Sequence, residues 1–148
     1  MLITLDSSVI VASVMEKEEH HDACAKLMNK LSKAEYDAAV PYSVLVEVTA
    51  SVKRRTDSEE LATIIENDLK NISSINFFEL SEWRTEEAVV IAAKTGLRGM
   101  DAIIVQIAKE HDASLVTLDN EIVQRAQSIV NIIKIEDILS KERNGEDE

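Results

Sequence analysis

Apolar residues along the chain form short continuous runs that alternate with stretches of helical period, and this pattern predicts strands alternating with helices. The predicted strands are residues 2–6, 37–40, 75–80, 114–119 and a last one at 132–135. The predicted helices are 7–15, 20–34, 42–55, 58–70, 81–95, 100–111 and 120–128, with a terminal turn or helix at 136–142. Strands joined through helices imply right-handed crossovers and a mostly parallel sheet covered on both faces. We therefore predict an α/β fold, a three-layer α/β/α sandwich.

Several residues mark where these helices should begin or end. Ser7 or Ser8 is expected to cap the first helix, and Ser58 to cap the helix at 58–70. Pro41 is well placed to open the helix that follows the second strand, because proline is favoured at the first helical position. Gly96 is a typical helix terminator.

The composition fits one small domain. The chain has 148 residues, 45% of them hydrophobic but only 3% aromatic, so Val, Ile, Leu and Ala must form most of the core. We expect a single domain over residues 1–140 and a polar, frayed tail over 141–148. The single cysteine, Cys24, excludes an internal disulfide and is expected in the core. The apolar start contains Asp6 and no preceding basic residue, which predicts neither a signal peptide nor a membrane span but a soluble cytoplasmic protein.

The net charge of -12 limits the functions that the chain can have. Non-specific binding to nucleic acid depends mainly on Lys and Arg side chains that neutralise phosphates. A nucleic-acid substrate is therefore compatible with this charge in two cases only. Either many acids lie away from the substrate, or part of the negative charge surrounds a bound cation.

Four acidic residues occupy positions where a carboxylate is informative. Asp6 and Asp119 end predicted strands, and ligands of open parallel sheets bind beyond the carboxyl ends of the strands. Asp101 begins a predicted helix, where unpaired backbone N–H groups favour an anion. Glu47 interrupts an apolar run at the edge of the apolar stripe of its helix. A carboxylate at such a position is costly unless it is paired, hydrogen-bonded or metal-bound.

Each acid also has a structural explanation. Asp6 and Asp119 could cap the helices that follow them, and Asp101 could be a favourable acid in a first helical turn. Taken singly, these are the simpler explanations for the three aspartates. Glu47 could instead form a salt bridge, for which the candidates are Arg54, Arg55, Arg84 and Arg98.

Taken together, the four acids predict a metal site. Carboxylates that converge without basic partners repel one another, which raises their pKa values and destabilises the fold. A hard cation removes this penalty, and oxygen-only carboxylate ligands favour Mg²⁺ or Mn²⁺. Such an ion can acidify a water molecule and stabilise charge on a phosphate.

Four short motifs that contain these acids resemble the PIN domain, the fold of many small metal-dependent ribonucleases. The motifs are LDSSV at 5–9, PYSVLVE at 41–47, MDAIIVQIA at 100–108 and LVTLD at 115–119. The resemblance covers about residues 1–135 and implies a divalent-metal-dependent endoribonuclease. It implies that Asp6 and Asp101 contact the metal most directly. Glu47 and Asp119 would contribute directly or through water molecules.

The resemblance also implies roles for three further residues. Ser8 and Thr117 match small hydroxyl positions with which the family holds the acids and water molecules in place. Arg98 lies three residues before Asp101 and is the best nearby candidate for a phosphate contact. A solvated charge explains Arg98 equally well.

The chain looks most like the toxin ribonucleases of VapBC-type toxin–antitoxin pairs, which are single PIN domains. This resemblance implies an RNA substrate, a homodimer and a small antitoxin partner. No association with a membrane is expected, because the apolar start of the chain is a poor membrane span. Three alternatives remain open: a stand-alone PIN domain in RNA processing, a non-catalytic protein-binding module, and a metal-dependent phosphatase or DNA nuclease. The preference for RNA comes from the resemblance alone, because nothing in the sequence recognises a 2′-hydroxyl group.

Other candidate clusters have simpler explanations. Residues 20–22, two histidines and an aspartate, predict an exposed helix start rather than a metal site, because consecutive helical residues point in different directions. The basic residues 53–55 lie about two turns after Glu47 and could contact phosphate, although a solvated helix end is the simpler explanation. Trp83 is expected in the core or at an interface.

Overall fold

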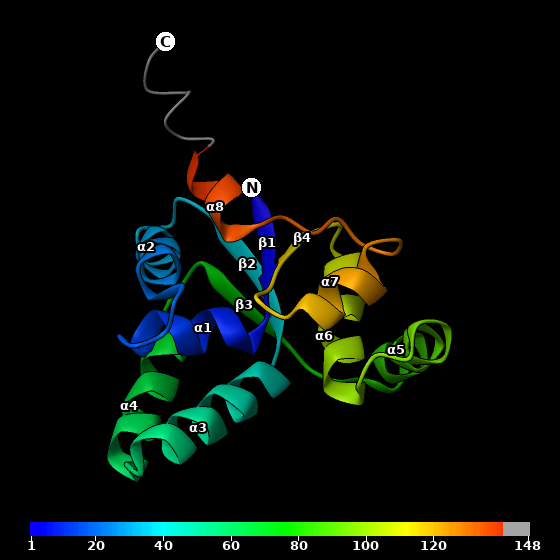
Figure 1. The fold of residues 1–148 in the computed structure, drawn as a ribbon. Coiled ribbons are helices and arrows are strands. Elements are labelled where there is room, and N and C mark those ends of the chain that lie inside the picture. The colour runs from blue at the N-terminus through cyan, green and yellow to red at the C-terminus, as the bar shows by residue number, and fades with distance from the viewer. Residues whose placement is uncertain (141–148) are drawn as a thin grey trace.

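The computed structural model describes residues 1–140, which form one sheet with helices on both faces (Figure 1). The strands are β1 (Leu2–Leu5), β2 (Asp37–Pro41), β3 (Ile75–Phe78) and β4 (Ser114–Val116). All pairings are parallel, and the strand order is β3-β2-β1-β4. The tail at 141–148, for which fraying is expected, lies outside the described residues.

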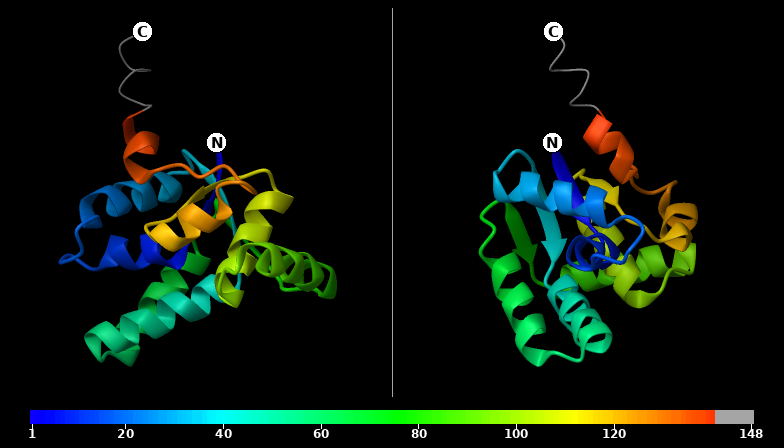
Figure 2. Two further views of the ribbon diagram at one scale, coloured as in Figure 1. Left: turned by 45° about the vertical axis from the view of Figure 1, so that its right-hand side comes forward. Right: turned by 60° about the vertical axis from the view of Figure 1, so that its left-hand side comes forward.

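The helices form the two outer layers of the sandwich. They are α1 (Ser7–Val14), α2 (His21–Ser32), α3 (Ser43–Thr56), α4 (Glu59–Lys70), α5 (Glu82–Thr95), α6 (Gly99–Glu110), α7 (Asn120–Ala126) and α8 (Ile135–Ser140). The chain steps from β1 to β2 to β3 through α1–α4, then returns across the sheet to β4 through α5 and α6. Right-handed crossovers therefore place α1–α4 on one face and α5–α6 on the other, as both figures of the whole fold show (Figures 1 and 2). This confirms the predicted α/β/α sandwich.

The centre of the sheet is buried on both faces, although Thr4 of β1, which points to the face opposite Ile3 and Leu5, is polar. β1 lies between β2 and β4, with Ile3 in register with Ala38 on one side and Ser114 on the other. Ile3 and Leu5 are fully buried, as expected for a parallel strand covered by two helical layers. Helix α6 packs across β1, β2 and β4, and its apolar face is buried along most of its length. Cys24 also lies in the core, as predicted.

The predicted helix boundaries are partly confirmed. Ser58 Oγ accepts the N–H of Leu61 at 3.0 Å, and Gly96 ends α5 in the left-handed conformation at φ 69°. Pro41, in contrast, does not open α3 but is the last residue of β2, paired in register with Phe78. Proline has no N–H to donate, which suits a strand end better than a strand interior. The prediction that Ser7 or Ser8 caps α1 is also wrong, because the N-cap position is Asp6.

The last predicted strand is replaced by a single bridge and a helix. Only Ile132 pairs with the sheet, through one isolated parallel bridge to Leu115. Ile135 then begins α8, where Ile135 and Ile138 are both buried. The short apolar run at 132–135 favours a strand, but the spacing of three between the buried Ile135 and Ile138 satisfies a helix packed on the core. α8 contacts α2.

Two further expectations from the sequence concern the position of Trp83 and the absence of a membrane-spanning helix. Trp83 is 53% exposed, so it is not a core residue. It lies on the same segment as other exposed apolar residues, Leu80, Val89, Val90 and Met100. Within residues 1–140, no helix combines the length and apolarity needed to cross a bilayer.

Candidate active site

Asp6 stands directly after β1, at the carboxyl edge of the sheet. It is only 4% exposed, and its Oδ2 accepts hydrogen bonds from Ser8 Oγ at 2.6 Å and from Thr117 Oγ1 at 2.9 Å. Although Asp6 occupies the N-cap position of α1, its side chain makes no capping hydrogen bond. The capping explanation for Asp6 is therefore wrong, and two hydroxyl groups orient the carboxylate instead.

Asp119 lies beyond the end of β4 and caps α7. Its Oδ1 accepts the N–H groups of Glu121 at 2.8 Å and Ile122 at 3.4 Å, which confirms the capping explanation. Its own N–H donates to Thr117 Oγ1 at 3.0 Å. Within the described chain, Oδ2 of Asp119 has no hydrogen-bond partner. One oxygen thus holds the helix while the other is available to a ligand.

Glu47 reaches the same region from α3. Its Oε1 is buried without any hydrogen-bond partner within residues 1–140, and its Oε2 has only a long contact of 3.5 Å with Ser7 Oγ. Burial, together with the negative charges of Asp6 and Asp101, raises the pKa of Glu47 from 4.5 to about 7. A half-buried, unpaired carboxylate of this kind is energetically costly without a ligand.

The salt bridges considered for Glu47 do not form in the described part of the chain. Arg55 pairs with Glu18 instead. Arg84 forms a bidentate pair with Glu110, with Nε and Nη2 at 2.9 Å and 3.0 Å from the two carboxylate oxygens. The ion-pair explanation for Glu47 is therefore wrong within residues 1–140.

Asp101 lies in the first turn of α6, as predicted. Burial, together with the negative charges of Asp6 and Asp119, raises its pKa from 3.8 to about 6. Arg98, an exposed residue at the N-cap position, partly opposes it by lowering the pKa of Asp101. The first-turn position is favourable for a carboxylate, but burial and the neighbouring acids together outweigh that benefit.

The structure thus brings four acids that are far apart in sequence close enough for their charges to affect one another's pKa values. Asp6 influences the pKa values of both Glu47 and Asp101, and Asp119 influences that of Asp101. Within residues 1–140, however, no three acidic, histidine or cysteine side chains lie close enough together to ligate one metal ion. The acids are grouped, but their side chains are not positioned as a closed ligand set.

Comparison with known proteins identifies the family. The sequence profile of the PIN domain matches residues 3–127. The chain belongs to the PIN domain family. No curated protein sequence matches this PIN domain.

Solved structures share the fold of this PIN domain at low sequence identity. Mycobacterium tuberculosis VapC20, a sarcin–ricin loop cleaving toxin, matches with a TM-score of 0.71 and 15% identity over 89% of this chain and 98% of that chain. Rickettsia felis VapBC2, solved with a DNA fragment from its promoter, has a TM-score of 0.63 and 19% identity, covering 90% of this chain and 98% of that chain. A toxin–antitoxin complex from Klebsiella pneumoniae has a TM-score of 0.63 and 16% identity, covering 90% and 96%.

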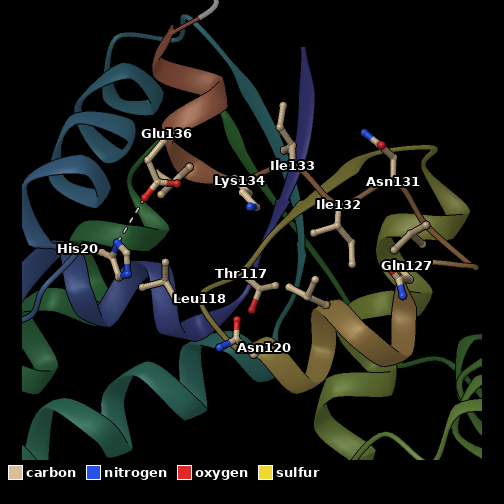
Figure 3. A pocket seen from close by; sticks show the side chains of 13 residues that line it. His20, Thr117, Leu118, Asn120, Gln127, Asn131, Ile132, Ile133, Lys134 and Glu136 are labelled. Carbon is tan, nitrogen blue, oxygen red and sulfur yellow. Dashed lines mark ion pairs between the residues drawn. The ribbon is translucent and has the colours of Figure 1, made fainter.

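Two hollows flank the acids of this PIN domain. One, of about 700 Å³, runs along α3 and the start of α1 and is lined by Ser7, Ser8 and Glu47. The other, of about 400 Å³, lies between α7 and the segment before α8 and includes Thr117 (Figure 3). Both include His20, Leu118 and Asn120. Ser8 lines the first hollow and Thr117 lines the second. The two hydroxyl groups that donate to Asp6 Oδ2 therefore belong to different hollows.

Reasoning from the sequence missed two residues near the acids. Ser7 gives Glu47 its only hydrogen bond in the described chain, and Glu121 raises the pKa of Asp101. Glu121 lies in the first turn of α7, two residues after Asp119. This closeness in sequence to a candidate site residue could have identified it. His20, in contrast, pairs with Glu136 of α8, with 3.5 Å between Nδ1 and Oε1 (Figure 3), and takes no part in a metal-ligand cluster within residues 1–140.

Proposed function

We propose that this PIN domain is a divalent-metal-dependent endoribonuclease whose site contains Asp6, Glu47, Asp101 and Asp119. The observation that carries the proposal is the unpartnered, buried Oε1 of Glu47 beside the charges of Asp6 and Asp101. Membership of the PIN family and the order of the four acids along the chain support it. A protein that keeps several mutually repelling carboxylates together retains a stability cost that a bound cation would remove.

The donor set fits Mg²⁺ or Mn²⁺. All candidate ligands are carboxylate oxygens, which these hard cations prefer. Asp6 and Asp101 would hold the ion most directly, with Glu47 and Asp119 contributing directly or through water molecules. Since no closed set of three ligands exists in the described chain, binding would require the acidic side chains to move closer together.

Each residue would have a distinct task in the reaction. The cation would acidify a water molecule and stabilise negative charge on the scissile phosphate. Ser8 and Thr117 hold Asp6 Oδ2 through two hydroxyl hydrogen bonds, which would leave Oδ1 for the cation. Arg98, exposed beside Asp101, would contact the phosphate through its guanidinium group.

We further propose that the chain is the toxin of a toxin–antitoxin pair that acts in the cytoplasm. The solved neighbours VapC20, VapBC2 and the Klebsiella complex, which are described as a toxin and as toxin–antitoxin proteins, support this role. A homodimer is part of the proposal. The exposed apolar residues of the segment from Leu80 to Met100 offer a surface for a second copy.

A cleavage assay tests the proposed activity. Purified protein would be incubated with a panel of RNAs, and with DNA of the same sequences, in the presence of Mg²⁺, Mn²⁺ or EDTA. We expect RNA cleavage with either ion, none in EDTA, and a loss of at least about a hundredfold in Asp101→Asn. Asp22→Asn is the matched control, because Asp22 is also a first-turn aspartate but lies on α2. Equal activity of the two variants would remove Asp101 from the mechanism.

A non-catalytic protein-binding module is the second candidate function. The net charge of -12 and the absence of a closed ligand set in the described chain favour it. It predicts no cleavage under any metal condition and tight binding to a small basic protein. Co-expression with the product of the neighbouring reading frame, followed by co-purification and the same cleavage assay, separates the two functions.

A further inference from the structure

Arg54 occupies the same side of α3 as Glu47 and lines the larger hollow with it. Glu47, Ser51 and Arg54 follow one another at spacings of four and three residues, which places them on one helix face. Seven residues of helix correspond to about 10 Å along the axis. Arg54 therefore lines the same hollow (the groove) as Glu47, about two helical turns further along α3.

The other two cations of this basic cluster are already neutralised. Lys53 Nζ lies 2.7 Å from Asp57 Oδ1, and Arg55 pairs with Glu18 across the groove. Lys53 also belongs to a different hollow, which it lines with residues of α4. Arg54 is exposed and forms no ion pair within residues 1–140. Of the three, it alone lines the groove without an ion pair within residues 1–140, although Glu19 and Glu47 also line this groove.

We propose that Arg54 binds a backbone phosphate of single-stranded RNA at a position adjacent to the cleavage site. The inference rests on the proposed ribonuclease function and names a substrate contact for it. A guanidinium group donates two parallel hydrogen bonds to phosphate oxygens, which fixes the strand in direction as well as in place. The Arg55–Glu18 pair forms the wall beside Arg54 and adds no net charge of its own.

The charge of the protein selects a single strand over a duplex. Duplex RNA would present the phosphates of both strands to a surface with a net charge of -12. A single strand in the groove brings fewer phosphates than a duplex near the negatively charged surface, and one of these phosphates can contact Arg54. The preference therefore follows from repulsion of the second strand, and it requires no recognition of bases.

Equilibrium binding in EDTA tests the contact without cleavage. Fluorescence anisotropy would compare an unstructured RNA oligonucleotide and its duplex, using wild type, Arg54→Ala, Arg54→Lys and Lys53→Ala as the matched control. We expect Arg54→Ala to weaken single-strand binding about tenfold and to reduce the slope of log K against log salt by about 0.7, the loss of one phosphate contact. Arg54→Lys should keep the slope, and Lys53→Ala should bind like wild type. The melting temperatures of all variants should agree.

The outcomes separate this inference from the proposed activity. Under cleavage conditions, Arg54→Ala should raise KM with little change in kcat, since the contact is present before and during the reaction. RNA cleavage with unchanged binding in Arg54→Ala would overturn the role of Arg54 and leave the nuclease standing. Arg54-dependent binding without cleavage in any metal would overturn the nuclease and leave Arg54 as an RNA contact only. No measurable RNA binding, or equal affinity for the duplex, would overturn the inference.

Discussion

Thr117 Oγ1 donates a hydrogen bond of 2.9 Å to Asp6 Oδ2, although 111 positions separate the two residues. The same hydroxyl oxygen accepts the N–H of Asp119 at 3.0 Å. One buried side chain thus links an acid at the end of β1 to an acid beyond β4. The relationship exists because β1 and β4 are parallel neighbours, with Leu5 in register with Val116.

Replacing Thr117 with valine should therefore cost more than the same change at another buried threonine. Thr117→Val removes one of the two hydroxyl hydrogen bonds to Asp6 Oδ2 and leaves the Asp119 N–H without its partner, and we expect a loss of about 1–3 kcal/mol in the free energy of unfolding. Thr4 is the control, because its Oγ1 is buried with no hydrogen-bond partner in the described chain. Thr4→Val should be neutral or stabilising. Urea unfolding of both variants measures the difference, and equal effects would contradict the role of the hydroxyl.

Stability of the metal-free protein should fall as pH rises from about 4.5 to about 7. The pKa of Glu47 is raised from 4.5 to about 7 in the folded chain, so the folded state binds a proton more tightly than the unfolded state. That contribution is complete below pH 4.5 and is lost as pH rises through the folded pKa. Asp101, whose pKa rises to about 6, acts in the same direction.

Glu47→Gln should flatten this dependence and raise the melting temperature at pH 8 by a few degrees, because the glutamine carries no charge to bury. Thermal unfolding in EDTA at several pH values measures it. Glu86→Gln, at an exposed position of α5, serves as the control. Parallel pH profiles for wild type and Glu47→Gln would show that Glu47 does not carry the effect.

Mn²⁺ should stabilise the protein at neutral pH. An ion that binds only the folded state contributes about 2.7 kcal/mol at a concentration of one hundred times its dissociation constant, which corresponds to a rise of about 5–10 °C in melting temperature. The rise should disappear in Asp101→Asn and persist in Asp22→Asn. Differential scanning calorimetry with and without Mn²⁺ is the measurement. An identical rise in both variants would place the ion elsewhere.

The two glycines near the start of α6 should respond in opposite directions to alanine. Gly96 has φ 69°, and a Cβ there would lie 2.9 Å from Arg125 Nη1, which donates to Thr95 O. Gly96→Ala should therefore destabilise the fold by about 1–2 kcal/mol. Gly99 stands in the first turn of α6, and a Cβ there would meet no atom within 4 Å beyond its own stretch of helix. Gly99→Ala should be neutral or stabilising by up to about 1 kcal/mol, and guanidinium unfolding tests the pair.

The sequence was most informative about local structure. The helical periods and the caps at Ser58 and Gly96 were predicted because they depend on residues a few positions apart. The wrong predictions arose where a short stretch of sequence is compatible with two local structures. Pro41 suits a helix start as well as a strand end, and the apolar residues at 132–135 satisfy both a strand and a buried helical turn. Only packing against the rest of the chain separates these alternatives.

From the sequence alone came the strand–helix alternation, the four acids and the expectation that strand ends would bring some of them together. The tertiary structure decided what each acid contacts: Asp6 is held by two hydroxyls, Asp119 caps a helix, and Glu47 has an oxygen with no partner in residues 1–140. It also separated Arg54 from Lys53 and Arg55, which are adjacent in sequence but face different partners. Periodicity specifies the face of an element, whereas the register of the sheet and the crossing of helices determine which faces meet.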